Sequence, residues 1–89
     1  MYRLETSSRF DKQYKKISKT KDILLVDEVI EILLSGKDLV PKHKDHFLKG
    51  NFKGYKECHI KPDLLLIYKK DDEILVLTCI RPGSHNTLF

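Results

Sequence analysis

The pattern of apolar and polar residues predicts a short strand and two helices in the first forty positions. Residues 2–6 alternate between the two kinds of residue, as a half-buried strand does. Residues 8–18 repeat an apolar residue every three or four positions, which predicts a helix with one narrow apolar stripe. Residues 21–35 have a wider apolar face and predict a second helix, which Gly36 would end. Two such helices would form a hairpin over one face of a sheet.

The second half of the chain predicts that sheet. Residues 37–51 have no clear period and predict a loop, whereas residues 52–60 alternate as a strand does. Residues 64–69 are apolar at both parities, as a central strand would be, and residues 73–80 predict the last strand. The expected fold class is α+β in the order β-α-α-β-β-β, a twisted, mostly antiparallel sheet with a helix pair on one face. We expect residues 1–89 to form a single domain.

The strand at residues 52–60 makes a specific prediction about faces. Successive side chains of a strand point to opposite faces, so Glu57 and His59 share one face while Cys58 and Ile60 share the other. If the helices cover the Cys58 side, Glu57 and His59 point to the open side. We expect that open side to be short of apolar cover and therefore concave or wet.

The composition is that of an ordinary globular domain. The longest apolar runs are far too short to cross a membrane, so no membrane association is expected. The first residues show no apolar run behind a basic start, so no signal peptide is visible and a cytoplasmic location is expected. In such a chain Cys58 and Cys79 are expected to be reduced core residues.

The net charge of +4 is unevenly spread along the chain. Residues 1–20 carry six cations against two anions, residues 21–40 carry two against five, and residues 41–60 carry five against two. A basic excess in two blocks favours an anionic partner such as nucleic acid. A lysine-rich surface that only keeps the protein in solution explains the charge equally well.

Residues 45–63 combine proton-transfer groups, cations and aromatic rings in a way that a core does not require. Cutting RNA without a metal needs a base for the ribose 2′-OH, an acid for the leaving 5′-oxygen and a cation for the phosphate. It also needs a surface that holds the bases apart. Histidine suits the first two roles because its ordinary pKa is near 6.5, arginine suits the third, and aromatic rings suit the last. The residues offered are His46, His59 and His85 with Glu57 and Asp63, then Arg81, Lys49 and Lys53, then Phe52, Tyr55 and Phe89.

Each of these residues taken singly has an ordinary structural interpretation, as a surface histidine, a strand-edge charge or a terminal anchor. Arg81 has the same parity as Leu75, Leu77 and Cys79 in the last predicted strand, and it could pair with Glu57 or Asp63. The prediction of phosphodiester chemistry therefore rests on the set. His43 is expected at the surface.

A metal site is the competing use of the same region. His43 and His46 are three residues apart, with Cys58, His59 and Asp63 further along. The chain has no tight ligand pair of the kind found in structural zinc sites, and Cys58 would point away from His59. We therefore expect no metal and no other cofactor.

Three separated motifs resemble a known family over nearly the whole chain. They are KDHFLKG at residues 44–50, ECHIKPDLLLIY at residues 57–68, and RPGSH at residues 81–85 with the Leu88–Phe89 ending. Together they closely resemble the YafQ branch of the RelE/ParE superfamily of bacterial type II toxins. The resemblance implies a RelE-like fold and a ribosome-associated mRNA endoribonuclease that needs no metal. It also implies a cognate antitoxin protein as partner, with operator DNA bound only through the antitoxin complex.

The resemblance also implies site residues, motif by motif. The family's active-site positions correspond to His46, His59, Asp63, His85 and Phe89, and further positions linked to activity correspond to Glu57 and Arg81. A histidine–carboxylate set would act at the 2′-OH, with His85 as the acid, and His46, His59 and Asp63 all stay open as the base.

One position departs from the family pattern, because Pro82 stands where Thr or Leu is usual. Proline lacks a backbone N–H and has a fixed φ, so a catalytically weakened RNA- or antitoxin-binding protein of the same fold is the alternative. A gyrase-poisoning relative is disfavoured, since that activity has no evident use for three proton-transfer residues.

Overall fold

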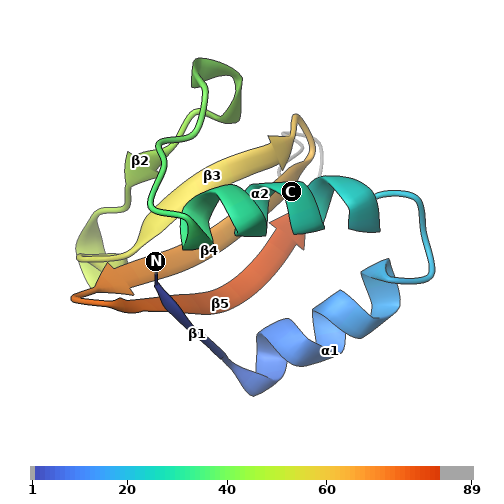
Figure 1. Ribbon diagram of the computed structural model, residues 1–89, viewed down its shortest axis with the longest axis horizontal. Coiled ribbons are helices and arrows are strands. Elements are labelled where there is room, and N and C mark those ends of the chain that lie inside the picture. Colours follow the sequence, from blue (N-terminus) through green and yellow to red (C-terminus); the bar gives the residue numbers. More distant parts are fainter. Residues whose placement is uncertain (1, 83–89) are drawn as a thin grey trace.

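The computed structural model describes residues 2–82, which form two helices and one mixed sheet (Figure 1). In chain order the elements are β1 (Arg3–Thr6), α1 (Ser8–Ile17), α2 (Ile23–Leu34), the 3-10 turn η1 (Pro41–His43), β2 (His46–Phe47), the 3-10 turn η2 (Gly50–Phe52), β3 (Lys56–Lys61), β4 (Leu64–Asp71) and β5 (Ile74–Pro82). Within the described residues the sheet has five strands in the order β1-β5-β4-β3-β2. The β1–β5 pair is parallel and the other pairs are antiparallel, which confirms the predicted α+β class.

A side-chain cap begins α1, and a wide apolar face defines α2. The Ser7 side chain accepts a hydrogen bond from the backbone N–H of Phe10 at 3.0 Å, so α1 starts with a standard N-cap. In α2 the buried residues recur every three or four positions, at Val26, Val29, Ile30 and Leu33. In Figure 1 α2 crosses one face of the sheet, while α1 lies beside the β1–β5 side. No helix within residues 2–82 is long and apolar enough to span a membrane.

One face of the sheet forms the core with the helices. Side chains from β3, β4 and β5 pack there against α2 and Phe10, namely Cys58, Ile60, Leu66, Tyr68, Leu75, Leu77 and Ile80. Burying one such aliphatic side chain contributes about 1.5–3 kcal/mol relative to leaving it in water. Glu57 and His59 are partly exposed while Cys58 and Ile60 are buried, which confirms the predicted faces of β3. Both cysteines are buried and reduced, as expected.

The sequence did not predict β2. Residues 37–51 were expected to be a loop, yet His46 and Phe47 pair with Glu57 and Lys56 at the edge of the sheet. The reason is length, because two residues are too few to display an alternating pattern. The pairing places the His46 backbone directly beside that of Glu57.

A bulge in β5 changes which face Arg81 occupies. Tyr68 pairs with Leu77 and Ile67 pairs with Cys79, so Thr78 is an extra residue without a partner on β4. Leu77 and Ile80 therefore both point to the helix side, and Cys79 and Arg81 point to the other side. The parity that Arg81 shares with Leu75 and Leu77 does not extend across the bulge, so Arg81 points away from the helices although these two leucines point toward them.

The second face of the sheet is not short of apolar cover in its middle, contrary to expectation. Leu65, Ile67 and Cys79 lie on it and are 7%, 1% and 9% exposed. The reason is that β4 is a central strand with apolar residues at both parities. The polar residues of this face, including Glu57, His59 and Arg81, surround that apolar centre.

Candidate active site

The centre of the candidate site is a histidine beside a carboxylate. The β2–β3 register sets His46 opposite Glu57, and residues paired across strands point to the same face. The His46 Nε2 atom lies 3.4 Å from Glu57 Oε1. The His46 side chain is 48% exposed and that of Glu57 is 13% exposed, so the ring is open to a ligand and the carboxylate lies beneath it.

The backbone fixes the tautomer of the His46 ring. Nδ1 of His46 lies 2.6 Å from the carbonyl oxygen of Lys44, and Lys44 adopts a left-handed backbone with φ 47° that follows η1. A carbonyl oxygen can only accept a hydrogen bond, so Nδ1 must carry the proton. In the neutral ring Nε2 then has the free lone pair, and a proton taken up there would meet the Glu57 carboxylate 3.4 Å away. This is the arrangement that a general base requires.

His59 and Arg81 form a second row on the same face. His59 pairs with Leu65, and Leu65 pairs with Arg81, so all three point to the side that carries His46 and Glu57. Glu57 and His59 are two residues apart on β3, which corresponds to about 6–7 Å, and two strand spacings separate the backbones of His59 and Arg81 by about 10 Å. An arginine side chain can bridge much of that distance.

Charged side chains near this face affect the pKa of the Cys79 thiol. Burial raises that pKa, the positive charges of Arg9 and Arg81 lower it, and the negative charge of Glu57 raises it. Cys79 therefore lies within the influence of all three charged side chains. The sequence indicated Arg81 and Glu57 as site residues but did not indicate Arg9.

His43 is buried against the strand that carries His59, although it was expected at the surface. It is 6% exposed, and its Nδ1 atom donates to the carbonyl oxygen of His59 at 2.7 Å. The expectation was wrong because η1 turns the chain so that the ring packs against β3. This hydrogen bond ties the loop before His46 to the strand that carries His59.

The contacts of Asp63 differ from those of the two histidines. It lies in the β3–β4 turn with its side chain 63% exposed, and its Oδ1 atom is 3.7 Å from Lys61 Nζ. No hydrogen bond or ion pair within residues 2–82 joins it to His46 or His59. Asp63 instead lines a surface cavity of about 230 Å³ together with Gln13 and Arg81.

The predicted substrate-binding lysines lie at the edge of the site. Lys49 and Lys53 flank η2 and are exposed. Between them Phe52 is 50% exposed and meets Tyr55 edge to face, with ring centroids 6.3 Å apart. Lys69 Nζ lies 5.5 Å from the centre of the Tyr55 ring, so cations and aromatic rings alternate here. This combination suits a single-stranded nucleic acid.

Two predicted site residues, His85 and Phe89, lie outside the described residues. Within residues 2–82 no group of three or more His, Cys, Asp and Glu side chains is arranged to hold a metal ion. The sequence missed one further cluster beside His46, formed by Asp45, Lys56 and Tyr68. Asp45 and Tyr68 are 23 residues apart, so no local pattern could have connected them.

The fold and the motifs define a bacterial toxin of a type II toxin–antitoxin system. The family described as bacterial toxin of type II toxin-antitoxin system, YafQ, matches residues 2–89. The chain belongs to this YafQ family.

Named relatives support the assignment. The chain is 35% identical over 88 residues to the mRNA interferase toxin YafQ of Escherichia coli K12, which covers 97% of this chain and 94% of the relative. It is 47% identical to a metal-bound toxin from Helicobacter pylori, with a TM-score of 0.79 and 100% of each chain covered. It is 32% identical to a chain of the E. coli DinJ-YafQ complex, with a TM-score of 0.84, 100% of this chain covered and 99% of the other.

Proposed function

We propose that this chain is the toxin of a type II toxin–antitoxin pair and cuts mRNA on the ribosome as a metal-independent endoribonuclease, acting as a single domain in the cytoplasm. The observation that carries the proposal is the placement of His46 Nε2, 3.4 Å from Glu57 and on the same sheet face as His59 and Arg81. The relative from E. coli K12 is named an mRNA interferase, which supports RNA as the substrate.

His46 is the base that the geometry favours. Its Nε2 atom has the free lone pair, and a proton taken up there faces the Glu57 carboxylate. His59 lies one row away, and Asp63 belongs to the cavity shared with Gln13 and Arg81. In the proposed step His46 removes the 2′-OH proton, the 2′-oxygen bonds to phosphorus, and the bond from phosphorus to the 5′-oxygen breaks.

Arg81 and the exposed lysines supply the positive charge that this step needs. Arg81 would bind the phosphate as negative charge builds on its oxygens, while Lys49 and Lys53 would hold the neighbouring backbone. The family motif assigns the proton for the leaving 5′-oxygen to His85. The products are a 2′,3′-cyclic phosphate and a 5′-OH.

Pro82 is compatible with an active enzyme. The backbone N–H of Ile80 points outward, to Gln13, and N–H groups of alternate residues in a strand point to the same side. Position 82 would therefore point its N–H away from β4, and a proline there removes no bond of the β4–β5 ladder. This supports an active enzyme over the alternative of a catalytically weakened binding protein.

The partner proposed for this chain is a cognate antitoxin, and operator DNA would be bound only through that complex. The E. coli relative is described in a DinJ-YafQ complex, which supports a protein partner. Lys12, Lys15, Lys16 and Lys19 lie on α1 or just after it and are exposed, so this surface suits an acidic segment. Adding the matching antitoxin at equal concentration should abolish cleavage.

The experiment uses ribosomes programmed with a defined mRNA, the purified chain, and mapping of the cut ends. We expect cleavage that persists after the purified chain alone has been treated with EDTA and freed of the chelator before it meets the Mg²⁺-stabilised ribosomes. It should fall by about 10²–10⁴-fold in His46→Gln, because the amide cannot take a proton. Glu57→Gln should also lose activity. The control is Glu28→Gln, which makes the same substitution at an exposed position of α2 and should keep full activity. Uncut mRNA with the wild type refutes the enzyme, and loss of cleavage after the chain alone has been treated with EDTA refutes metal independence. Equal cleavage of free RNA refutes the need for the ribosome.

A further inference from the structure

The strand that carries His46, β2, is too short to fix the position of His46 by its own hydrogen bonds. β2 consists of His46 and Phe47, and its register with β3 comprises two residue pairs. After β2 the Leu48 N–H donates to the Tyr55 carbonyl at 2.9 Å, but within the described part of the chain no residue just before His46 pairs with β3. A strand of this length at a sheet edge is marginal without tertiary support. Something outside the ladder must therefore fix the residue before His46.

Asp45 provides that support through both of its carboxylate oxygens. Oδ1 accepts a short hydrogen bond from the Tyr68 hydroxyl, and Oδ2 accepts one from Lys56 Nζ at 2.7 Å. Tyr68 is fully buried in the centre of the sheet, so it is a rigid anchor. Lys56 Nζ also lies 5.0 Å from the centre of the Phe47 ring, which ties the next residue of β2 to the same group.

Asp45 and His46 make their contacts on opposite faces of the sheet. Tyr68 and Lys56 belong to the row that faces the helices, and His46 pairs with Glu57 on the other face. The hydrogen bond that fixes the His46 tautomer runs to Lys44, so Asp45 lies between its two ends. Any drift of the Asp45 backbone would change the distance from Nδ1 to that carbonyl oxygen.

We propose that Asp45, held by Tyr68 and Lys56, is the positioning residue that keeps His46 in the Nδ1–H tautomer with Nε2 beside Glu57. Asp45 does not touch the substrate, and it acts through His46. The inference deepens the proposed function, since it explains how the proposed base is held. It also makes a statement about the His46 ring that can be tested whether or not the chain cuts RNA.

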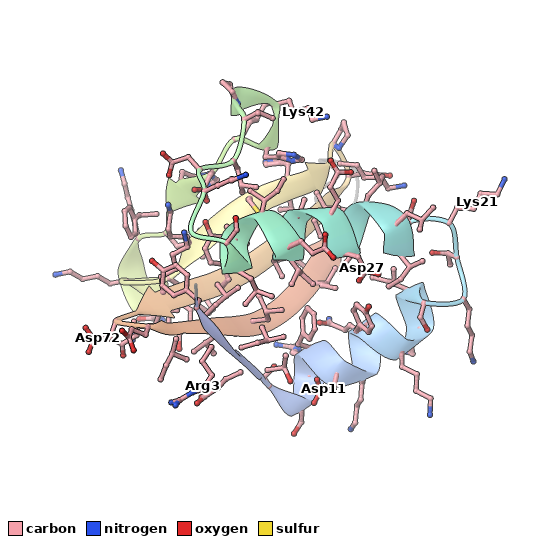
Figure 2. All side chains as sticks on the ribbon, in the orientation of Figure 1. Arg3, Asp11, Lys21, Asp27, Lys42 and Asp72 are labelled. Atoms are coloured by element: carbon pink, nitrogen blue, oxygen red, sulfur yellow. The ribbon has the colours of Figure 1, made fainter. Side chains whose placement is uncertain are left out.

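The experiment compares two tyrosines that make the same kind of bond. Tyr68 donates to Asp45, and Tyr14 donates to Asp27 at 2.5 Å. Asp27 lies on the side of α2 that faces α1, away from β2 (Figure 2). Tyr68→Phe and Tyr14→Phe each remove one tyrosine–carboxylate hydrogen bond, and both should lower the urea midpoint. Only Tyr68→Phe should affect His46.

Two readouts decide the question. The first is the pair of imidazole ¹⁵N chemical shifts of His46 in the labelled full-length chain at a pH where the ring is neutral, assigned with His46→Gln. The wild type and Tyr14→Phe should show the Nδ1–H tautomer, and Tyr68→Phe should show a mixture. The second is the cleavage rate at saturating programmed ribosomes, which should fall about 10- to 100-fold in Tyr68→Phe with KM changed less than about 3-fold.

An unchanged tautomer and rate in Tyr68→Phe overturn the proposal, and so does an equal loss of rate in Tyr14→Phe, which would mean a general effect of stability. If Tyr68→Phe does not fold, Asp45→Ala decides by the same two readouts, because the Asp45 side chain is 22% exposed and its removal takes away no apolar side chain of the core. If the wild type cuts no RNA, the proposed function fails, and the ¹⁵N shifts alone still support or overturn the role of Asp45.

Discussion

Gln13 connects α1 to the strand that carries Arg81. β1 pairs with β5 only as far as Leu77, so no other strand among residues 2–82 lies beside the outer edge of β5 beyond the bulge. At that edge Gln13 Oε1 accepts the backbone N–H of Ile80 at 2.7 Å. The next residue is Arg81, whose position on the open face depends on the path of β5 after the bulge. Changing Gln13 to Leu keeps the size of the side chain and removes the acceptor.

The size of the effect follows from the burial of that edge. Ile80 is 4% exposed, so its N–H would find no easy replacement partner in water. Leaving such a donor unsatisfied destabilises the folded state by about 1–3 kcal/mol. A domain with about 5 kcal/mol of stability would still be more than about 95% folded after that loss. A fall in cleavage of about 10-fold or more would therefore report the misplacement of Arg81.

The assay pairs urea unfolding with cleavage of mRNA on programmed ribosomes. Gln13→Leu should lose both stability and activity, whereas Gln13→Glu keeps an oxygen acceptor and should stay close to the wild type in both. A Leu variant with the wild-type urea midpoint would show that the hydrogen bond contributes nothing. A Leu variant that is less stable but fully active would show that α1 does not set the position of Arg81.

Three further results are expected. Ser7→Ala should lose about 0.5–2 kcal/mol of stability by urea unfolding, because Ser7 caps α1 and also donates to the Thr78 carbonyl at 2.5 Å. The control Ser8→Ala, at the neighbouring exposed serine, should not lose stability. Equal losses in the two variants would contradict the role of Ser7. Pro82→Thr should leave cleavage within about 2-fold of the wild type, since the missing N–H points away from β4, and a rise of 10-fold or more would favour the silenced alternative. Burial raises the pKa of the Cys58 thiol from 9.0 to about 12, so its contribution to the free energy of unfolding should be fully present below pH 9 and should be lost as the pH rises towards 12. The variant Cys58→Val should remove part of that loss. A urea midpoint of the wild type that is unchanged between pH 7 and pH 10.5 would contradict the burial argument.

The sequence was sufficient for the elements with a long, regular pattern. Both helices, and the three strands of the second half, follow from apolar spacing over six or more residues. The opposition of Glu57 and Cys58 across β3 followed from strand parity alone and is confirmed. These predictions succeed because burial of one face is a property that every residue in the element shares.

The sequence was not sufficient where one residue changes the geometry. The extra residue at Thr78 reverses the face of Arg81, and nothing in the local alternation marks it. The left-handed backbone of Lys44, which aims a carbonyl at His46, is likewise invisible in a lysine. The burial of His43 and the contact between Asp45 and Tyr68 arise from tertiary packing between distant segments.

The measurement that tests the central claim most directly is cleavage of an mRNA with a single 2′-deoxynucleotide at the mapped cut position, on programmed ribosomes. If His46 and its neighbours activate the 2′-OH, cleavage at that position should disappear, and the unmodified mRNA should yield a 2′,3′-cyclic phosphate. Cleavage of the deoxy-substituted mRNA at the same position and rate would contradict the account.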